Sequence, residues 1–170
     1  MSLLATAREV VANFIYPEGV ERRDRAERDA ETDALTGLAN RRALSRALPA
    51  AERDPLTSVC LFDANNFGLV NKRCGHEKGD VLLVLVARCI ERAASRYGYG
   101  VRVFRSGGDE FLVLCHSRVA DELCADAECE FGTHDICEGV RVSLTGSIGA
   151  TFREADMGLQ SKKEKSKRRS

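Results

Sequence analysis

The sequence predicts an α+β sandwich, in which helices flank a central, mainly antiparallel sheet. Three observations predict the α+β class. Short apolar runs of strand length alternate with longer stretches that repeat apolar residues at helical spacing. Two strand-like runs, 101–104 and 111–114, enclose a Gly-Gly turn typical of an antiparallel hairpin. The length of 170 residues suits one domain with an appended element.

Composition restricts the class of protein. Apolar residues make up 44% of the chain and charged residues 31%, which suits a soluble globular domain and excludes collagen-like, coiled-coil and disordered chains. The longest apolar run, 81–87, is far shorter than the roughly 20 residues of a membrane span, so no membrane contact is expected. Seven cysteines without regular spacing favour reduced thiols and a cytoplasmic location.

Charge is unevenly distributed, although 26 basic and 26 acidic residues cancel over the whole chain. Residues 161–170 carry a net charge of plus five and residues 1–160 a net charge of minus five. A basic tail of this kind attracts phosphate or an acidic surface, and a solvated, frayed terminus is the alternative. The acidic body lacks the interleaved aromatic residues of nucleic-acid-binding surfaces, so no nucleic-acid partner is expected.

The beginning of the chain is predicted to be helical. Apolar residues at helical spacing over 3–15 indicate an amphipathic helix that ends at Pro17. The charge-rich stretch 20–32 is an exposed helix or connector, and residues 1–32 form a lead-in that we expect to help bring two copies together. The domain itself is expected over 33–170, where a turn at 33–40 precedes a helix at 41–51.

The following elements build the sheet and its helices. The apolar run 58–62 predicts a buried strand that ends at Asp63. The stretch 79–95 predicts a buried helix with Asp80 as its N-cap. After the hairpin, residues 140–148 predict one more strand, which a final helix follows.

Two carboxylates are candidates for a metal site. Asp63 and Asp109 each stand where an apolar strand gives way to a turn, so both emerge at one edge of the sheet if the strands are neighbours. Hard oxygen ligands with room for water and phosphate are what Mg²⁺ requires. Gly107 and Gly108 would let a phosphate approach closely, although a plain hairpin uses the same turn residues.

A second cluster follows Asp63. The backbone amides of the turn at 65–68, including those of Asn66 and Phe67, could hold phosphate oxygens. Asn71 and Asp80 supply an amide and a carboxylate, which can accept and donate the hydrogen bonds that distinguish guanine from adenine. The alternatives are a turn residue for Asn71 and a helix cap for Asp80.

These motifs, taken in order, resemble the markers of the GGDEF-domain diguanylate cyclases. The resemblance covers about residues 32–167 and rests on five segments: 33–42, Asp63 with Asn71 and 75–80, 105–111, 147–149, and 155–156 ahead of Lys163. It implies a palm-like sheet flanked by helices, as in nucleotidyl cyclases. It also implies that two GTP molecules are condensed into cyclic di-GMP with release of two pyrophosphates.

The resemblance implies a role for each matching residue. Asp63 and Asp109 would bind Mg²⁺, or Mn²⁺ in its place, with the Ala64 carbonyl as a third ligand. Glu110 would support the metal site or a proton transfer. The remaining residues would bind substrate: Asn71 and Asp80 the guanine, and Arg105, Lys163 and Lys167 the phosphates.

The reaction would require a homodimer. One such site holds one GTP, and two copies that face each other across a twofold axis would let each nucleotide attack the other. A monomer should therefore be inactive. The sequence identifies neither an upstream sensor nor a partner protein.

Several positions depart from the family pattern. Asn65 replaces an Asp, Gly68 replaces a Lys, and the connection between Ile148 and Ala155 is short, which leaves the placement of Lys163 and Lys167 open. Positions 98–101 lack the Arg and Asp of the family's product-inhibition motif, so no feedback through that motif is expected. The alternative function is a catalytically weak domain that binds GTP or cyclic di-GMP and acts as a signalling module.

A zinc site is a minor alternative for one group of residues. The potential ligands fall within a short segment: Cys124, Cys129, His134 and Cys137. Because they include no Cys-x-x-Cys pair, free thiols and a surface histidine are favoured.

Overall fold

The computed structural model describes residues 29–98, 100–137 and 139–167. The amphipathic helix predicted at 3–15, and all but the last residues of the lead-in at 20–32, therefore lie outside the described residues. The described elements are helices and strands in mixed order. They are α3 (Arg41–Ala51), β1 (Thr57–Ala64), α4 (Phe67–Cys74), α5 (His76–Ser95), β2 (Arg102–Gly107), β3 (Glu110–His116), the 3-10 turn η1 (Ser117–Val119), α6 (Ala120–Phe131), β4 (Thr133–Cys137), β5 (Val140–Gly149) and α7 (Phe152–Lys167).

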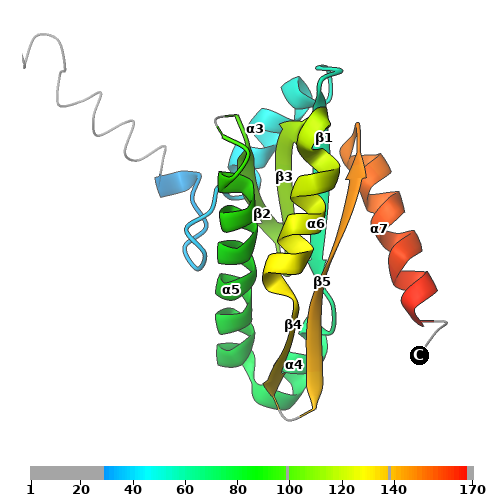
Figure 1. The fold of residues 1–170 in the computed structure, drawn as a ribbon. Helices are drawn as coiled ribbons and strands as arrows, with labels where there is room; N and C mark the ends of the chain where they lie inside the picture. Colours follow the sequence, from blue (N-terminus) through cyan, green and yellow to red (C-terminus); the bar gives the residue numbers. More distant parts are fainter. Residues whose placement is uncertain (1–28, 99, 138, 168–170) are drawn as a thin grey trace, which may run out of the picture.

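The centre of the molecule is a five-stranded sheet in the order β2-β3-β1-β5-β4 (Figure 1). Each pair of neighbouring strands is antiparallel. The predicted α+β fold with an antiparallel sheet is confirmed. The strand β1 lies in the middle of the sheet, so the carboxylate of Asp63 near its end is carried by the most enclosed strand.

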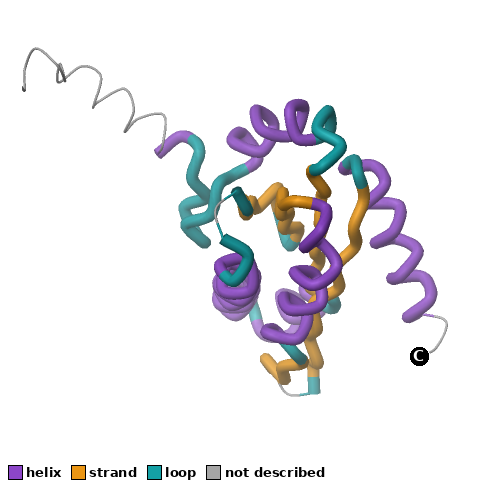
Figure 2. The backbone as a smooth tube through the Cα atoms, turned by 45° about the horizontal axis from the view of Figure 1, so that its top comes forward, coloured by secondary structure: helices purple, strands orange, loops and turns teal. Residues whose placement is uncertain are grey.

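Helices cover both faces of the sheet (Figure 2). Alternate residues of β1 divide between two apolar cores, because successive strand side chains point to opposite faces. Cys60 and Phe62 pack with α4, α5 and α6, whereas Val59 and Leu61 pack with α3 and α7. Asp63 shares the parity of Val59 and Leu61, so its side chain lies on the α3 and α7 face.

The helix predicted at 79–95 begins three residues earlier, at His76, after Gly75 at a φ of 82°. Asp80 therefore lies within α5 and is not its N-cap, which corrects the sequence prediction. The prediction also lacked α4, α6 and β4. The buried stripe of α6 is made partly of Ala120, Cys124 and Ala127, which are weak hydrophobic signals in a segment rich in acidic residues.

Among the cysteines that the structure describes, five are free thiols: Cys60, Cys89, Cys115, Cys124 and Cys129. Cys74 is disulfide-bonded, so the expectation of reduced thiols is wrong for this residue. Among the described residues, no helix combines the length and the apolar character that crossing a membrane requires.

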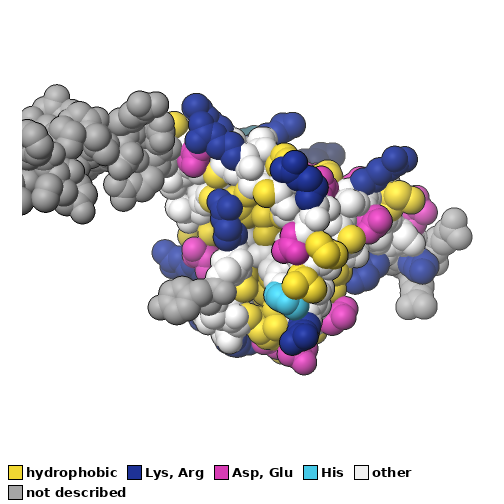
Figure 3. Space-filling view, turned by 90° about the horizontal axis from the view of Figure 1, so that it is seen from above, with side chains coloured by type: hydrophobic (Ala, Val, Ile, Leu, Met, Phe, Trp, Pro, Cys, Tyr) yellow, Lys and Arg dark blue, Asp and Glu magenta, His cyan; other side chains and the backbone are white. Residues whose placement is uncertain are grey.

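A pocket of about 500 Å³ lies at the end of the sheet where β1 begins and β3 ends. Its wall includes Ala47 and Ala51 of α3, Leu56 and His116. The view from above shows apolar side chains interspersed with charged ones on this end (Figure 3). The pocket is separated by the length of β3 from the turn that carries Asp109.

The helix α7 packs very closely on β5 at Gly149. A Cβ atom on Gly149 would lie 2.5 Å from the backbone nitrogen of Ala155. We expect Gly149→Ala to destabilise the protein by about 2 kcal/mol, because helix backbone has to move to make space. Gly68→Ala is the matched control: a Cβ there meets nothing within 4 Å, and we expect a stabilisation of about 0.5 kcal/mol. Urea unfolding checks both, and equal effects of the two substitutions would contradict the packing argument.

Candidate functional site

The pairing of β1 with β3 places the acidic turn beside Asp63. Asp63 is directly opposite Glu110 in the antiparallel register, and Asp109 precedes Glu110 in the turn between β2 and β3. Gly107 and Gly108 have φ angles of 149° and 53°, which residues with a Cβ rarely adopt. The glycine pair therefore gives the turn its shape and brings its carboxylates to the end of the central strand.

Asp63 and Asp109 interact electrostatically. The pKa of Asp109 is raised, first because the carboxyl group is partly buried and then because the negative charge of Asp63 is close. Asp63 is 7% exposed, and its Oδ2 lies 2.6 Å from the Nζ of Lys163 on α7. Two partly desolvated carboxylates with one lysine thus form an acidic centre that can attract a cation.

The short connection before α7 does not carry Lys163 away from this centre. The helix begins after Thr151, whose Oγ1 accepts a hydrogen bond from the Glu154 amide, and the Glu154 carboxylate accepts one from Ala150. These contacts fix the start of α7 within two residues of the end of β5. The side chain of Lys167 lies outside the described residues, so its predicted phosphate contact stays a prediction.

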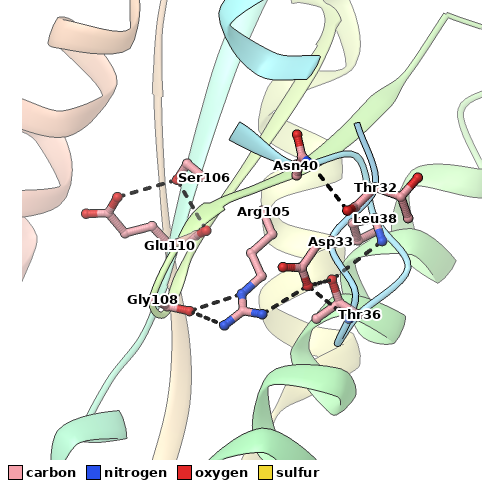
Figure 4. Close-up of polar contacts among 9 residues, drawn as sticks. All are labelled: Thr32, Asp33, Thr36, Leu38, Asn40, Arg105, Ser106, Gly108 and Glu110. Atoms are coloured by element: carbon pink, nitrogen blue, oxygen red, sulfur yellow. Dashed lines mark hydrogen bonds and ion pairs between the residues drawn. The ribbon is translucent and has the colours of Figure 1, made fainter. Parts of the chain in front are cut away.

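Arg105 lies on β2 beside the turn, and its guanidinium contacts protein groups on two sides (Figure 4). Its Nε and Nη2 donate to the carbonyl of Gly108 at 3.1 and 2.8 Å, and its Nη1 lies 2.9 Å from the Oδ1 of Asp33. The Arg105 side chain is 12% exposed. Its predicted role in phosphate binding stays a prediction, whereas the structure shows that it connects the acidic turn to the segment before α3.

Asp33 links that segment to Arg105. Burial raises the pKa of Asp33, but hydrogen bonds from the Thr36 hydroxyl and amide and the interaction with Arg105 outweigh burial and lower it. The neighbouring Asn40 caps α3 and donates to the carbonyls of Ala30 and Thr32. The turn at 33–40 is therefore a hydrogen-bonded connection between the lead-in and the acidic turn.

We expect Asp33→Asn to destabilise the protein by about 1 kcal/mol at neutral pH, because the ion pair with Arg105 is lost. Since the folded-state pKa of Asp33 is lowered, its contribution is present above the unfolded-state pKa and is lost as pH falls through the folded-state pKa. The difference between the two proteins should therefore shrink in acid. Urea unfolding over a pH series measures it, and a difference independent of pH would contradict this account.

The turn after β1 is held by asparagine side chains. The Asn65 amide donates to the hydroxyls of Thr145 and Ser143 at 2.6 and 3.1 Å. Asn66 is left-handed with a φ of 67°, and its side chain donates to the Arg141 carbonyl. The sequence analysis did not predict this role of Asn65. The available signal was the pair of hydroxyl residues Ser143 and Thr145, which lie two positions apart on β5 and therefore share a face.

Asn71 lies on α4 and contacts α5 at Gly79, a residue that has no side chain. A Cβ on Gly79 would lie 1.9 Å from the Oδ1 of Asn71. This Oδ1 atom is buried and has no hydrogen-bond partner in the described part of the structure. Asp80, which follows Gly79 on α5, is exposed. The predicted amide and carboxylate therefore come from two adjoining helices, with one acceptor atom unsatisfied.

Glu110 borders a pocket on the α3 face. The pocket has a volume of about 590 Å³, and its wall includes Arg41, Ser45, Asp109 and Phe152. The Glu110 carboxylate is exposed and lies 3.4 Å from the Ser106 hydroxyl (Figure 4). Glu110 is thus on the solvent side of the acidic centre and is accessible to a second molecule.

The described residues contain no group of three or more His, Cys, Asp or Glu side chains that could hold a metal ion. Of the four zinc candidates, Cys124 is buried in α6, Cys129 is exposed, and the side chain of Cys137 lies outside the described residues. The pair Asp63 and Asp109 remains compatible with Mg²⁺, which needs one or two carboxylates and keeps several waters.

An antiparallel palm-like sheet with an acidic turn beside its central strand defines the class of the protein. A family model described as "Diguanylate cyclase, GGDEF domain" matches residues 30–169. The chain belongs to this GGDEF family. The resemblance seen in the sequence is confirmed.

Relatives in this family support the assignment. The chain is 31% identical to a diguanylate cyclase of Vibrio cholerae, over 88% of this chain and 52% of the relative. It is 36% identical to the cyclic di-GMP phosphodiesterase PdeB of Shewanella oneidensis, over 74% of this chain and 15% of the relative. The chain thus spans about half or less of the length of these relatives.

Solved structures show the same fold. The coiled coil and GGDEF domain of DgcB from Caulobacter crescentus, in complex with c-di-GMP, aligns over 96% of this chain and 95% of that chain with a TM-score of 0.73 and 22% identity. The GGDEF domain of TpbB from Pseudomonas aeruginosa aligns over 79% of this chain and 89% of that chain with a TM-score of 0.64 and 28% identity.

Proposed function

We propose that this chain is a diguanylate cyclase domain that condenses two GTP molecules into cyclic di-GMP and releases pyrophosphate. The observation that carries the proposal is the acidic centre, in which Asp63 and Asp109 meet beside Lys163. In-line attack on an α-phosphate builds negative charge on the attacking and leaving oxygens. A site of this composition can hold a metal-bound triphosphate and neutralise that charge.

The donor set of the acidic centre fits Mg²⁺, with Mn²⁺ as a substitute. Asp63, Asp109 and the Ala64 carbonyl are hard oxygen ligands, and they would hold the ion at the end of β1. The bound ion would polarise the phosphate oxygens. Lys163 forms an ion pair with Asp63, and its flexible ammonium would turn towards a bound phosphate.

Asn71 and Asp80 would hold the guanine. The Asp80 carboxylate accepts from the N1 and N2 hydrogens of guanine, which adenine does not present. The buried Oδ1 of Asn71 has no hydrogen-bond partner among the described residues, and such an atom costs about 1–3 kcal/mol unless a ligand or water satisfies it. Rotation of this amide out of the contact with Gly79 and towards a bound guanine would remove that cost. The turn amides of Asn66 and Phe67 would contact the phosphates.

Turnover would take place in a homodimer, since each site supplies one of the two nucleotides. Glu110 faces solvent beside the acidic centre, where the second nucleotide would arrive, and would assist proton removal from its 3′-hydroxyl. The contribution of the lead-in, residues 1–32, to dimerisation stays a proposal that deletion of this segment would test.

Incubation with GTP and Mg²⁺ over a series of protein concentrations tests the proposal. We expect cyclic di-GMP to form, and we expect the activity per milligram to fall on dilution because the reaction needs two copies. Added cyclic di-GMP should not inhibit through positions 98–101, which lack the charged motif. Failure to detect product in protein shown to be dimeric would reject the enzymatic proposal.

The alternative is a domain that binds GTP or cyclic di-GMP and signals through a partner. Asn65 favours this alternative function. It stands at a position where the family pattern has an acid, and its side-chain amide donates hydrogen bonds to Ser143 and Thr145. GTP binding without turnover in the dimeric protein would select this function.

A further inference from the structure

Past the first residue of β4, Thr133, the outer edge of β5 has no strand beside it in the described part of the chain. Within the described residues, β4 pairs with β5 only as far as Ser143, whereas β1 pairs with β5 up to Gly149. The edge is closed at Gly146 by two side chains. The Gly146 amide donates to the Glu128 carboxylate of α6 at 2.7 Å, and the Gly146 carbonyl accepts from the Nζ of Lys162 of α7 at 2.6 Å.

The lysine that closes this edge is the neighbour of the lysine in the acidic centre. Lys162 bonds to β5, and Lys163 reaches past β5 to Asp63 on β1. Consecutive residues of a helix point about 100° apart, so both contacts form together at one rotation of α7 about its axis. The contact of Lys162 with β5 therefore restricts the direction of Lys163.

Close packing earlier in α7 sets the distance between helix and strand. A Cβ on Gly158 would lie 2.2 Å from the Oγ of Ser147, and Leu159 is 3% exposed. Lys162 follows one turn later. It is the last residue of α7 whose side chain hydrogen-bonds to β5 in the described part of the chain.

We propose that Lys162 is a positioning residue for the nucleotide site, which fixes the last turns of α7 so that Lys163 faces Asp63. This inference rests on the proposed cyclase function only for its effect on turnover. The contact of Lys162 with the Gly146 carbonyl does not depend on that function. In the described part of the structure, Lys162 donates to a backbone carbonyl and forms no hydrogen bond or ion pair with Asp63 or Asp109.

Three variants test the inference. Lys162→Met removes the donor but keeps a flexible apolar stem, and Lys162→Arg keeps a charged donor. Lys165→Met is the control, because it removes the same charge from an exposed position of the same helix. Amide hydrogen exchange over residues 159–165 without nucleotide reports on the end of α7, and the KM for magnesium GTP reports on the site.

We expect exchange to be about 10-fold faster in Lys162→Met than in Lys165→Met. We also expect KM to rise about 5-fold while kcat changes by less than about 2-fold, because ground-state and transition-state binding of the phosphates weaken together. Lys162→Arg should restore both values. Identical behaviour of Lys162→Met and Lys165→Met would overturn the inference. If the unaltered protein does not turn over GTP, the proposed function fails, and hydrogen exchange alone still decides the role of Lys162.

Discussion

Under the proposed function, Asp109→Asn is expected to lower the rate of cyclic di-GMP formation by about 10³-fold or more, since a carboxylate that would hold the metal ion is lost at the reacting centre. The control is Asp121→Asn, the same chemical change at an exposed position of α6. The control should leave the rate unchanged. Product formation from GTP, measured for both variants in the dimeric state, checks the prediction. A fall of less than about 10-fold in Asp109→Asn would show that the carboxylate is not needed for the chemistry.

The same substitution should stabilise the nucleotide-free protein. Burial and the nearby Asp63 raise the pKa of Asp109, so the folded state disfavours the charge of this carboxylate. The penalty is present when Asp109 is ionised and disappears as pH falls through its raised folded-state pKa. Loss of activity with a gain in stability would therefore separate a functional carboxylate from a structural one, because a structural carboxylate would lose both.

Four of the five strands of the sheet, all but β4, could be predicted from the sequence because their signals are local. The apolar runs of β1 and the hairpin of β2 and β3 each carry a complete strand pattern, and the glycine pair at 107–108 marks the turn. The N-terminus of α5 could not be placed in this way. Its start depends on Gly75 in an extended conformation at positive φ, and Asp80 only looks like a cap until His76 is known to be helical.

The acidic centre could be predicted for a similar reason. Asp63 and Asp109 both follow strand-like segments, so neighbouring strands suffice to bring them together. The engagement of Arg105 with Asp33 and the Gly108 carbonyl could not be predicted, because it depends on how a turn 72 residues earlier folds back onto β2. The contact of Lys162 with β5 could not be predicted either. Its partner is a backbone carbonyl, which every residue has, so no residue type in the sequence indicates it.

Guanine selectivity should depend on one carboxylate of α5. Asp80→Asn is expected to lower kcat/KM for GTP by about 100-fold, because a charged acceptor for the N1 and N2 hydrogens becomes a neutral amide. Inosine triphosphate lacks the N2 amino group, so the variant should also discriminate less between GTP and inosine triphosphate. Glu77→Gln, on the first turn of α5, is the control and should change neither value.

Gly79→Ala tests the other half of the proposed guanine site without replacing a polar side chain. The new Cβ would lie 1.9 Å from the Oδ1 of Asn71, so the amide has to move out of its place between α4 and α5. We expect GTP affinity to fall by about 10-fold, because misplaced recognition groups lose their hydrogen bonds. Unchanged binding of GTP in a folded Gly79→Ala protein would show that Asn71 does not contact the base. In that case, the unsatisfied Oδ1 would have no function in substrate recognition, and selectivity would rest on Asp80 alone.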